Sequence, residues 1–135
     1  MNYSPTKREQ RYFKQARKQS KLSSHDKARI GAVIVRGNFI AGRGCNQFKT
    51  HPVQRRYDKK SGYYGINSHI HAEVAALINT GRHDLTGAEI YIYREDMRDN
   101  LAQCRPCVSC TQALKDAGVK HVFYNDSNGY CYEVF

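Results

Sequence analysis

The sequence predicts a single α/β domain in which helices pack over a mixed β-sheet. Short, almost wholly apolar runs alternate along the chain with segments whose apolar residues recur at spacings of three and four. The 135 residues contain no Ser/Gly/Pro-rich linker, so residues 1–135 are expected to form one domain.

The first 42 residues predict a helix and a β-hairpin. Residues 6–22 are expected to be helical, with a narrow stripe of small or apolar residues on one face, made of Phe13, Ala16 and Ser20. The apolar run 30–35 fits a strand that is buried on both faces. After a turn around Gly37, residues 39–42 are expected to return as the second strand of a hairpin.

The middle of the chain predicts a long loop and a second helix. Residues 46–67 lack periodicity and are expected to form a surface loop, which at that length is usually functional or disordered. The helix is expected to start near Ser68 and to end at Gly81. Its core-facing residues are expected to be Ile70, Val74, Leu77 and Ile78.

The rest of the chain predicts a strand, a helix and a final pair of strands. Residues 88–93 read as a β-strand, and Pro106 is expected to open a helix that runs to about Ala117. Residues 119–124 form the next strand, and residues 130–135 return along it after a turn. The predicted order is therefore α, β, β, α, β, α, β, β.

The formal net charge of +10 is concentrated in two segments. Residues 1–29 hold nine Lys/Arg against two acidic residues, and residues 46–64 hold five against Asp58. Such concentrated positive charge favours phosphate-bearing partners, either nucleotides or nucleic acid. It is equally consistent with solvated surfaces that only aid solubility.

The cysteine pattern indicates metal coordination in a reducing compartment. Cys104, Cys107 and Cys110 crowd together, and a total of five cysteines does not suit a disulfide framework. The isolated Cys45 and Cys131 are expected to be small buried hydrophobic residues. Neither a signal-like apolar leader nor a stretch of roughly 20 apolar residues is present, so we expect a cytoplasmic protein with no membrane partner.

One set of residues has the composition of a catalytic zinc site. Zinc catalysis requires three protein ligands with soft or borderline donors and a fourth position open to water. Cys107 and Cys110 lie three apart at the start of a predicted helix, which places both sulfurs on one side and near the positive end of its dipole. His71 begins another helix, so the three side chains can converge on one metal.

Glu73, two residues beyond His71, is a candidate proton shuttle rather than a fourth ligand. On a helix, that spacing turns its carboxylate about 200° away from the imidazole direction. Bending in the first turn can nevertheless bring the carboxylate beside a metal-bound water, where it accepts a proton and later returns it.

The combination His71-Ala72-Glu73 and Pro106-Cys107-Val108-Ser109-Cys110 resembles the H-x-E…P-C-x-x-C signature of the zinc nucleobase deaminases. The surrounding chain agrees, since residues 31–35 and Gly44-Cys45-Asn46 look like elements of the deoxycytidylate and transfer-RNA adenosine deaminase branches. The resemblance spans about residues 28–124 and implies a three-layer cytidine deaminase-like fold, with a mixed five-stranded sheet and helices on both faces.

The resemblance also implies a mechanism and a set of site residues. Zn²⁺ would be held by His71, Cys107 and Cys110, and Glu73 would take a proton from the attacking water. Glu73 would then deliver protons to the ring nitrogen and to the leaving ammonia. The amide of Ala72 would bind the carbonyl of the base, and Asn46 matches a position that contacts the sugar or base in relatives.

Two simpler interpretations of the cysteines compete with this one. A purely structural zinc site needs a fourth protein ligand, which Cys104 can supply, but it leaves Glu73 without a role. A redox role for the C-x-x-C pair Cys104 and Cys107 ignores His71 and Glu73. We therefore expect Cys104 to be a bystander. A second zinc would need ligands from Cys45 and the remaining histidines, whose spacing does not require one.

The substrate is expected to be a free (deoxy)nucleotide such as dCMP, or a nucleoside, whose cytosine is converted to uracil with release of ammonia. Lys49, Arg55, Arg56 or Arg105 can provide a compact phosphate pocket. The alternative is deamination of cytosine or adenine in single-stranded DNA or tRNA, for which the mixture of cations and tyrosines in residues 55–64 is suited. The predicted terminal hairpin replaces the extra helix of both the nucleic-acid and the deoxycytidylate branches. It resembles the ending of the free-nucleoside cytidine deaminases, although those usually have cysteine at the position of His71. Relatives commonly assemble, so a homo-oligomer is expected.

Overall fold

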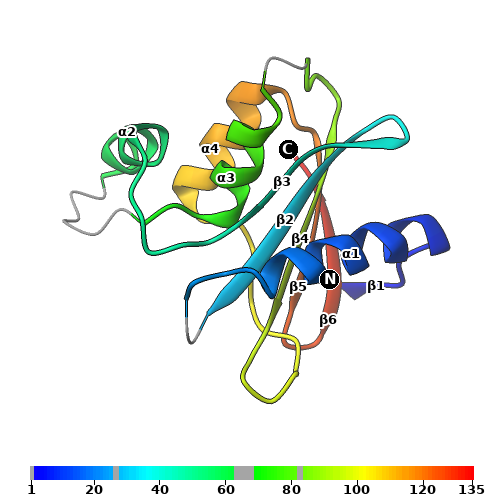
Figure 1. The fold of residues 1–135 in the computed structure, drawn as a ribbon. Coiled ribbons are helices and arrows are strands. Elements are labelled where there is room, and N and C mark those ends of the chain that lie inside the picture. The colour runs from blue at the N-terminus through cyan, green and yellow to red at the C-terminus, as the bar shows by residue number, and fades with distance from the viewer. Residues whose placement is uncertain (1, 26–27, 63–68, 82–83) are drawn as a thin grey trace.

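The computed structural model describes residues 2–25, 28–62, 69–81 and 84–135, which form an α/β domain (Figure 1). Its strands are β1 (Asn2–Tyr3), β2 (Arg29–Arg36), β3 (Phe39–Cys45), β4 (Glu89–Glu95), β5 (His121–Asp126) and β6 (Gly129–Val134). Its helices are α1 (Lys7–Ser20), α2 (Pro52–Lys60), α3 (Ala72–Asn79) and α4 (Val108–Ala117). None of these helices, within the described ranges, is long and apolar enough to cross a bilayer.

The sheet is mixed and has the strand order β1-β6-β5-β4-β2-β3. β4 and β5 are parallel and are connected through α4, whereas the other neighbouring strands are antiparallel. The five predicted strands and the final hairpin are thus confirmed, within a sheet that has six strands. The two-residue strand β1, which the sequence did not indicate, pairs with the outer edge of β6.

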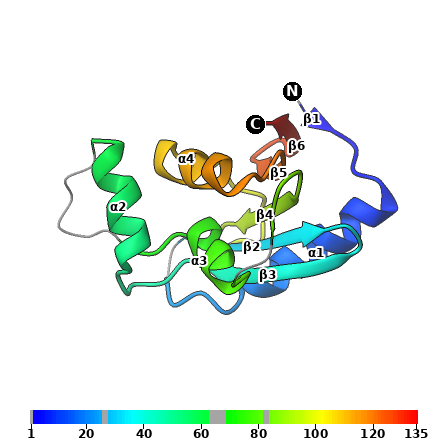
Figure 2. The ribbon, with the colours of Figure 1, turned by 90° about the horizontal axis from the view of Figure 1, so that it is seen from above.

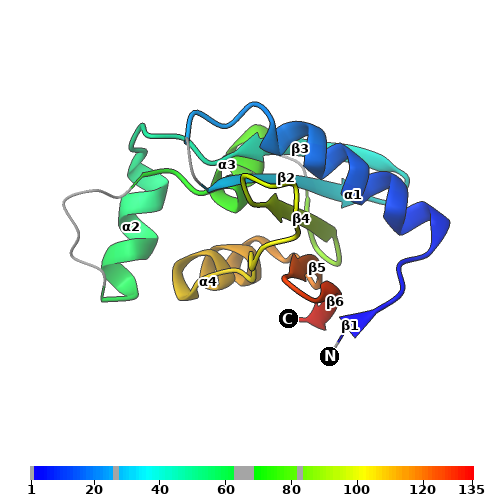
Figure 3. The ribbon, with the colours of Figure 1, turned by 90° about the horizontal axis from the view of Figure 1, so that it is seen from below.

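Helices cover both faces of the sheet, which confirms the three-layer architecture. Figures 2 and 3 show α1 on one face and α4, together with α3, on the other. Under α3 and α4, the buried cluster includes Ala32, Ile34, Ala72, Ala76, Ile90, Ile92 and Leu114. Under α1, the cluster consists of Phe13, Ala16, Val33, Val35, Tyr91, Tyr93 and Phe123. Successive residues of β2 and β4 therefore serve opposite cores, which explains why their sequences are continuously apolar.

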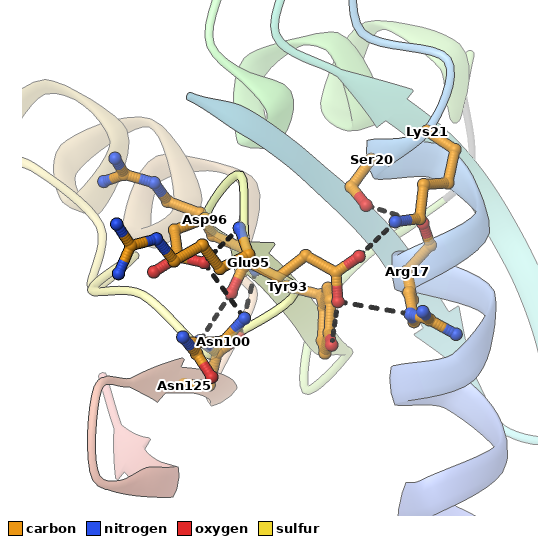
Figure 4. A network of polar contacts seen from close by, with 10 residues as sticks. Arg17, Ser20, Lys21, Tyr93, Glu95, Asp96, Asn100 and Asn125 are labelled. Carbon is orange, nitrogen blue, oxygen red and sulfur yellow. Dashed lines mark hydrogen bonds and ion pairs between the residues drawn. The ribbon is translucent and has the colours of Figure 1, made fainter. Parts of the chain in front are cut away.

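Helix α1 is joined to the sheet by its small and apolar stripe and by ion pairs. The predicted stripe is confirmed, because Phe13, Ala16 and Ser20 are all buried. At the C-terminal end of α1, Arg17 and Lys21 both pair with the buried carboxylate of Glu95, which also accepts a hydrogen bond from the Tyr93 hydroxyl (Figure 4). At its other end, Arg8 binds Glu89 through both of its terminal nitrogens. Part of the positive charge of this helix is thus neutralised within the fold.

Two predictions about the middle of the chain are wrong. Residues 46–67 were expected to be a loop, but they contain α2, which begins with Pro52 after an N-cap at His51. The buried side chains of α2 are polar, so no apolar periodicity marks the helix. The next helix begins at Ala72 and not near Ser68, a residue that lies outside the described ranges, and Ile70 precedes the helix.

Glycines in the central hairpin let helices approach the strands closely. A Cβ atom on Gly31 would lie 2.1 Å from the carbonyl oxygen of Ala16 and 2.3 Å from the amide nitrogen of Ser20, both in the backbone of α1. On the opposite face, a Cβ atom on Gly44 would lie 2.5 Å from the amide nitrogen of Ala76 in α3. The absence of side chains at these positions sets the distance between the layers.

Replacing Gly31 tests this close packing. Gly31→Ala is expected to lower the free energy of unfolding by about 3 kcal/mol, because the added methyl group overlaps backbone atoms that cannot rotate away. Gly37→Ala is the matched control, since Gly37 has φ 63° and open space around it, and it should cost about 1 kcal/mol through backbone strain alone. Urea denaturation of both variants measures the difference. Equal losses would contradict the proposed overlap.

Candidate metal centre and catalytic pocket

Three potential metal ligands meet where α3 and α4 begin. His71 is the N-cap of α3, Cys107 is the N-cap of α4, and Cys110 lies in the first turn of α4. His71 Nδ1 is 3.2 Å from Cys110 Sγ and 3.6 Å from Cys107 Sγ. Within the described ranges, these three residues form the group of histidine, cysteine and acidic side chains able to hold a metal, with all ligand atoms within 4.8 Å of one another.

The donor set and its spacing fit zinc. Tetrahedral zinc, with Zn–S near 2.3 Å and Zn–N near 2.0 Å, keeps neighbouring donor atoms about 3.6 Å apart. The distances from His71 Nδ1 to the two sulfurs, 3.2 and 3.6 Å, are close to that separation. Three protein donors leave one corner of a tetrahedron for water or substrate, which is the arrangement of a catalytic zinc site.

The surroundings of Cys107 favour its thiolate form. A hydrogen bond from Cys110 and the neighbouring His71 lower the pKa of Cys107 to about 4, although burial opposes the shift. The hydrogen bond with Cys107 raises the pKa of His71 to about 9, again against the effect of burial. The positive end of the α4 dipole lies at the same place. Cys107 is therefore poised to bind a cation as a thiolate.

Glu73 lies beside these donors in a buried position. It is the second residue of α3 and is only 5% exposed. Burial raises the pKa of its carboxyl group, while His71 and a hydrogen bond with Cys110 act in the opposite direction. A cavity of about 350 Å³ is lined by Glu73, His71 and Cys107. Glu73 and two of the three donor residues, His71 and Cys107, thus line the same cavity.

Asn46 also lines this cavity, but its side chain is engaged by the backbone. Its Oδ1 atom accepts hydrogen bonds from the Ile30 amide at 2.9 Å and the Ser23 hydroxyl at 2.7 Å. Its Nδ2 atom donates to the Ala28 carbonyl oxygen at 2.5 Å. Both acceptor sites of the amide oxygen are therefore used within the protein. This side chain thus ties the end of β3 to Ser23, Ala28 and Ile30 beside the cavity. Its contact with substrate stays a prediction.

Arg105 lines the cavity, whereas Ala72 lies between two lining residues, His71 and Glu73, without lining it itself. The Arg105 guanidinium forms a bidentate pair with Glu133 of β6, at 2.7 and 3.0 Å. Ala72 is fully buried as the first residue of α3, where a backbone N–H has no acceptor within the helix. Its amide is thus available by position to bind a carbonyl oxygen, whereas Arg105 would have to exchange Glu133 for a phosphate.

Cys104 takes no part in the metal group. Its thiol is buried and donates to the Asn125 carbonyl oxygen at 3.3 Å, and burial raises its pKa to about 12. A protonated thiol that is bound to a carbonyl is a poor fourth ligand, so the geometry does not favour the structural-zinc interpretation.

Two supporting residues were not identified from the sequence. Asn125 is fully buried, accepts from the Arg94 amide and donates to the carbonyl oxygens of Arg94 and Ala102. It thereby holds the loop that leads to Cys107. Gln54 of α2 is equally buried and accepts a hydrogen bond from the His71 amide. Asn125 was assigned to a turn but lies in β5, and nothing in its sequence context indicates burial.

Two histidines that line the cavity contact the ring of Phe48. The ring of Phe48 stacks on His25 with centroids 4.8 Å apart and meets His69 edge to face at 5.3 Å. His25 and His69 both line the cavity. Two further histidines form hydrogen bonds: His51 accepts from the Val53 amide, and His121 contacts the Tyr132 hydroxyl. His83 lies outside the described ranges.

The sequence is similar to that of a phage enzyme. It is 27% identical over 115 residues to the deoxycytidylate deaminase of Mycobacterium phage D29, a match that covers 76% of this chain and 81% of that protein.

Solved structures share the fold. The dCMP deaminase of cyanophage S-TIM5 matches in its apo form with a TM-score of 0.66 and 23% identity, covering 91% of this chain and 86% of the other. The cytidine deaminase of Burkholderia pseudomallei matches with a TM-score of 0.65 and 16% identity, covering 93% and 91%. At these identities, the likeness establishes the three-layer fold alone.

The family comparison is more direct. The model of the cytidine and deoxycytidylate deaminase zinc-binding region matches residues 6–126, which include the donor group and Glu73. The chain therefore belongs to the cytidine and deoxycytidylate deaminase family, whose members are zinc-dependent hydrolases that act on the exocyclic C–N bond of a nucleobase.

Proposed function

We propose that the protein converts cytosine to uracil in a free (deoxy)nucleotide such as dCMP, or in a nucleoside, with release of ammonia. The observation that carries this proposal is the single cavity lined by the metal donors His71 and Cys107 together with the buried carboxyl group of Glu73. Two comparisons support the substrate: the phage D29 relative is named a deoxycytidylate deaminase, and the S-TIM5 enzyme of similar fold has a structure with dCMP and dUMP.

His71, Cys107 and Cys110 are the proposed zinc ligands. When bound there, zinc supplies a Lewis acid that makes a water molecule acidic enough to react near neutral pH. Glu73 accepts one proton of that water molecule while the water oxygen attacks the ring carbon that bears the amine. Glu73 delivers this proton to the ring nitrogen, then takes the remaining proton from the added hydroxyl and passes it to the amine, so that water and cytosine give uracil and ammonia. The Ala72 amide binds the base carbonyl and orients the ring.

Glu73→Gln separates proton transfer from metal binding. The variant is expected to retain zinc and to lose turnover by at least about 10³-fold, because the amide cannot accept the proton. Zinc content by elemental analysis and uracil formation by chromatography measure the two effects. Glu89→Gln is the control, since this carboxylate binds Arg8 on the opposite face of the sheet and should not affect turnover. Normal activity of Glu73→Gln would refute the assigned role.

Cys110→Ser tests the ligand assignment. Loss of a thiolate donor is expected to remove zinc and to lower the unfolding temperature together, because metal binding and folding of the site are coupled. Zinc content and thermal melting with and without a chelator measure this. Cys104→Ser is the matched control and should retain the metal. Full zinc occupancy in Cys110→Ser would show that another residue completes the site.

Arg105 is the proposed phosphate contact. Arg105→Ala is expected to raise KM for dCMP about tenfold, the value of one charge-assisted hydrogen bond, and to leave KM for deoxycytidine unchanged. Steady-state kinetics on both substrates measure the ratio. Equal changes for the two substrates would mean that Arg105 serves only to tie the loop to Glu133.

Nucleic-acid deamination is the second candidate, and α2 supplies the observation that favours it. Its exposed surface carries four cations, namely Arg55, Arg56, Lys59 and Lys60. Product analysis with deoxycytidine, dCMP and single-stranded oligonucleotides distinguishes the two candidates, and we expect conversion of the small substrates. Conversion of oligonucleotides alone, with affinity falling roughly 10³-fold between about 50 and 200 mM salt, would favour the second candidate.

A cytoplasmic homo-oligomer is also proposed. Several large apolar side chains are exposed in the single chain and can be covered by further copies, among them Leu22, Met97, Val108 and Val134. Light scattering of the purified protein tests the assembly.

A further inference from the structure

Two polar side chains on the inner side of α2 are buried next to the metal donors. Gln54 is fully buried and Asp58 is 7% exposed. They lie one helical turn apart, and Gln54 Nε2 donates to Asp58 Oδ1 at 2.9 Å. Gln54 Oε1 accepts the backbone N–H of His71, also at 2.9 Å. The Gln54 amide thus links the α2 carboxylate to the main chain of a proposed zinc ligand.

Asp58 determines which way the Gln54 amide points. If the amide were rotated by half a turn, its oxygen would face the Asp58 carboxylate and its NH₂ group would face the N–H of His71. Both contacts would then pair like with like, and a buried amide without partners is costly. The observed orientation is the one in which both hydrogen bonds form, so Asp58 keeps an acceptor directed at His71.

The His71 amide requires such an acceptor. His71 is the N-cap of α3, with φ −84° and ψ 156°. Its carbonyl oxygen accepts from the Ala75 amide at 2.9 Å, but its own N–H has no acceptor within the helix. The preceding residue, Ile70, is bound by a different segment. Its amide donates to the Lys49 carbonyl at 2.9 Å, and its carbonyl accepts from the Gln47 amide at 3.2 Å. Together with Gln54, these bonds fix the backbone from which the imidazole projects toward the two cysteines.

The attachment of α2 to the rest of the protein is distinct from its contact with His71. Tyr57, on the same helix, donates to Asp116 of α4 at 2.8 Å. Removal of this bond weakens the attachment of α2 without touching the His71 amide. The chain therefore offers a control that separates a general effect of α2 from a specific effect of Gln54.

We propose that Gln54 and Asp58 are positioning residues that hold the His71 backbone, and through it the imidazole, in the geometry that binds zinc. This inference rests on the proposed role of His71 as a zinc ligand. Groups that orient metal ligands through hydrogen bonds commonly affect metal affinity by about 10- to 100-fold.

Gln54→Met removes the acceptor and keeps a side chain of similar length. We expect it to weaken zinc binding by about 10- to 100-fold, measured on the folded chain by competition with a chromogenic chelator. The cobalt-substituted protein should show an altered visible spectrum, which reports ligand geometry without any assay of turnover. Tyr57→Phe should leave both measurements unchanged.

A charge-swapped pair provides a rescue. Asp58→Asn alone is expected to weaken zinc binding, because the Gln54 amide is no longer held in one orientation. In the double variant Gln54→Glu with Asp58→Asn, the new carboxylate can accept from the His71 amide and from the asparagine NH₂ group. Both hydrogen bonds are then restored: the His71 amide still donates to residue 54, and only the bond between positions 54 and 58 runs in the opposite direction. Recovery of affinity in the double variant supports the inference even where Gln54→Met does not fold.

The outcomes distinguish this inference from the proposed function. If the unmodified protein binds no zinc, the proposed function and the inference fail together. If it binds zinc and Gln54→Met binds equally well, only the inference is overturned. Equal losses in Gln54→Met and Tyr57→Phe, or a double variant no better than Asp58→Asn, would also overturn it, because α2 would then act only through its general attachment.

Discussion

The convergence of two helix N-termini is the constraint on which the rest of the site depends. His71 and Cys107 are both N-cap residues, so each of these two side chains stands at the point where an extended segment turns into a helix. The positive ends of two helix dipoles meet there, which favours thiolates and the carboxylate of Glu73. Helix α4 starts there because it crosses between the parallel strands β4 and β5, and ligands of α/β sheets commonly bind beyond the carboxyl ends of such strands.

Local chemistry explains how much of this arrangement the sequence could predict. The grouping of His71, Cys107 and Cys110 was predicted because the spacing of a histidine, a glutamate and two cysteines matches a specific signature. The strands were predicted because burial on both faces leaves a continuous apolar run, as in residues 30–35. Helix α2 was missed because the residues it buries, Gln54 and Asp58, are polar. Their burial depends on partners that are distant in sequence, such as the His71 amide.

The distribution of charge bears on the choice of partner. The sequence showed an excess of cations without showing which were neutralised by carboxylates. In the structure, Arg8 pairs with Glu89, and both Arg17 and Lys21 pair with Glu95, so α1 uses part of its charge to attach itself to the sheet. The cations of α2 are exposed on the element that also contacts His71. An anionic partner that binds α2 would therefore lie close to the catalytic pocket.

The glycines of β3 have a consequence for how the site can vary in evolution. Because Gly44 carries no side chain, α3 rests directly on the strand at Ala75 and Ala76, and this contact sets the height of the helix above the sheet. Any larger residue there would lift the helix and carry the imidazole away from the thiolates. Substrate preference can consequently diverge through the rim and the loops, whereas the hairpin beneath the catalytic centre has almost no freedom to change.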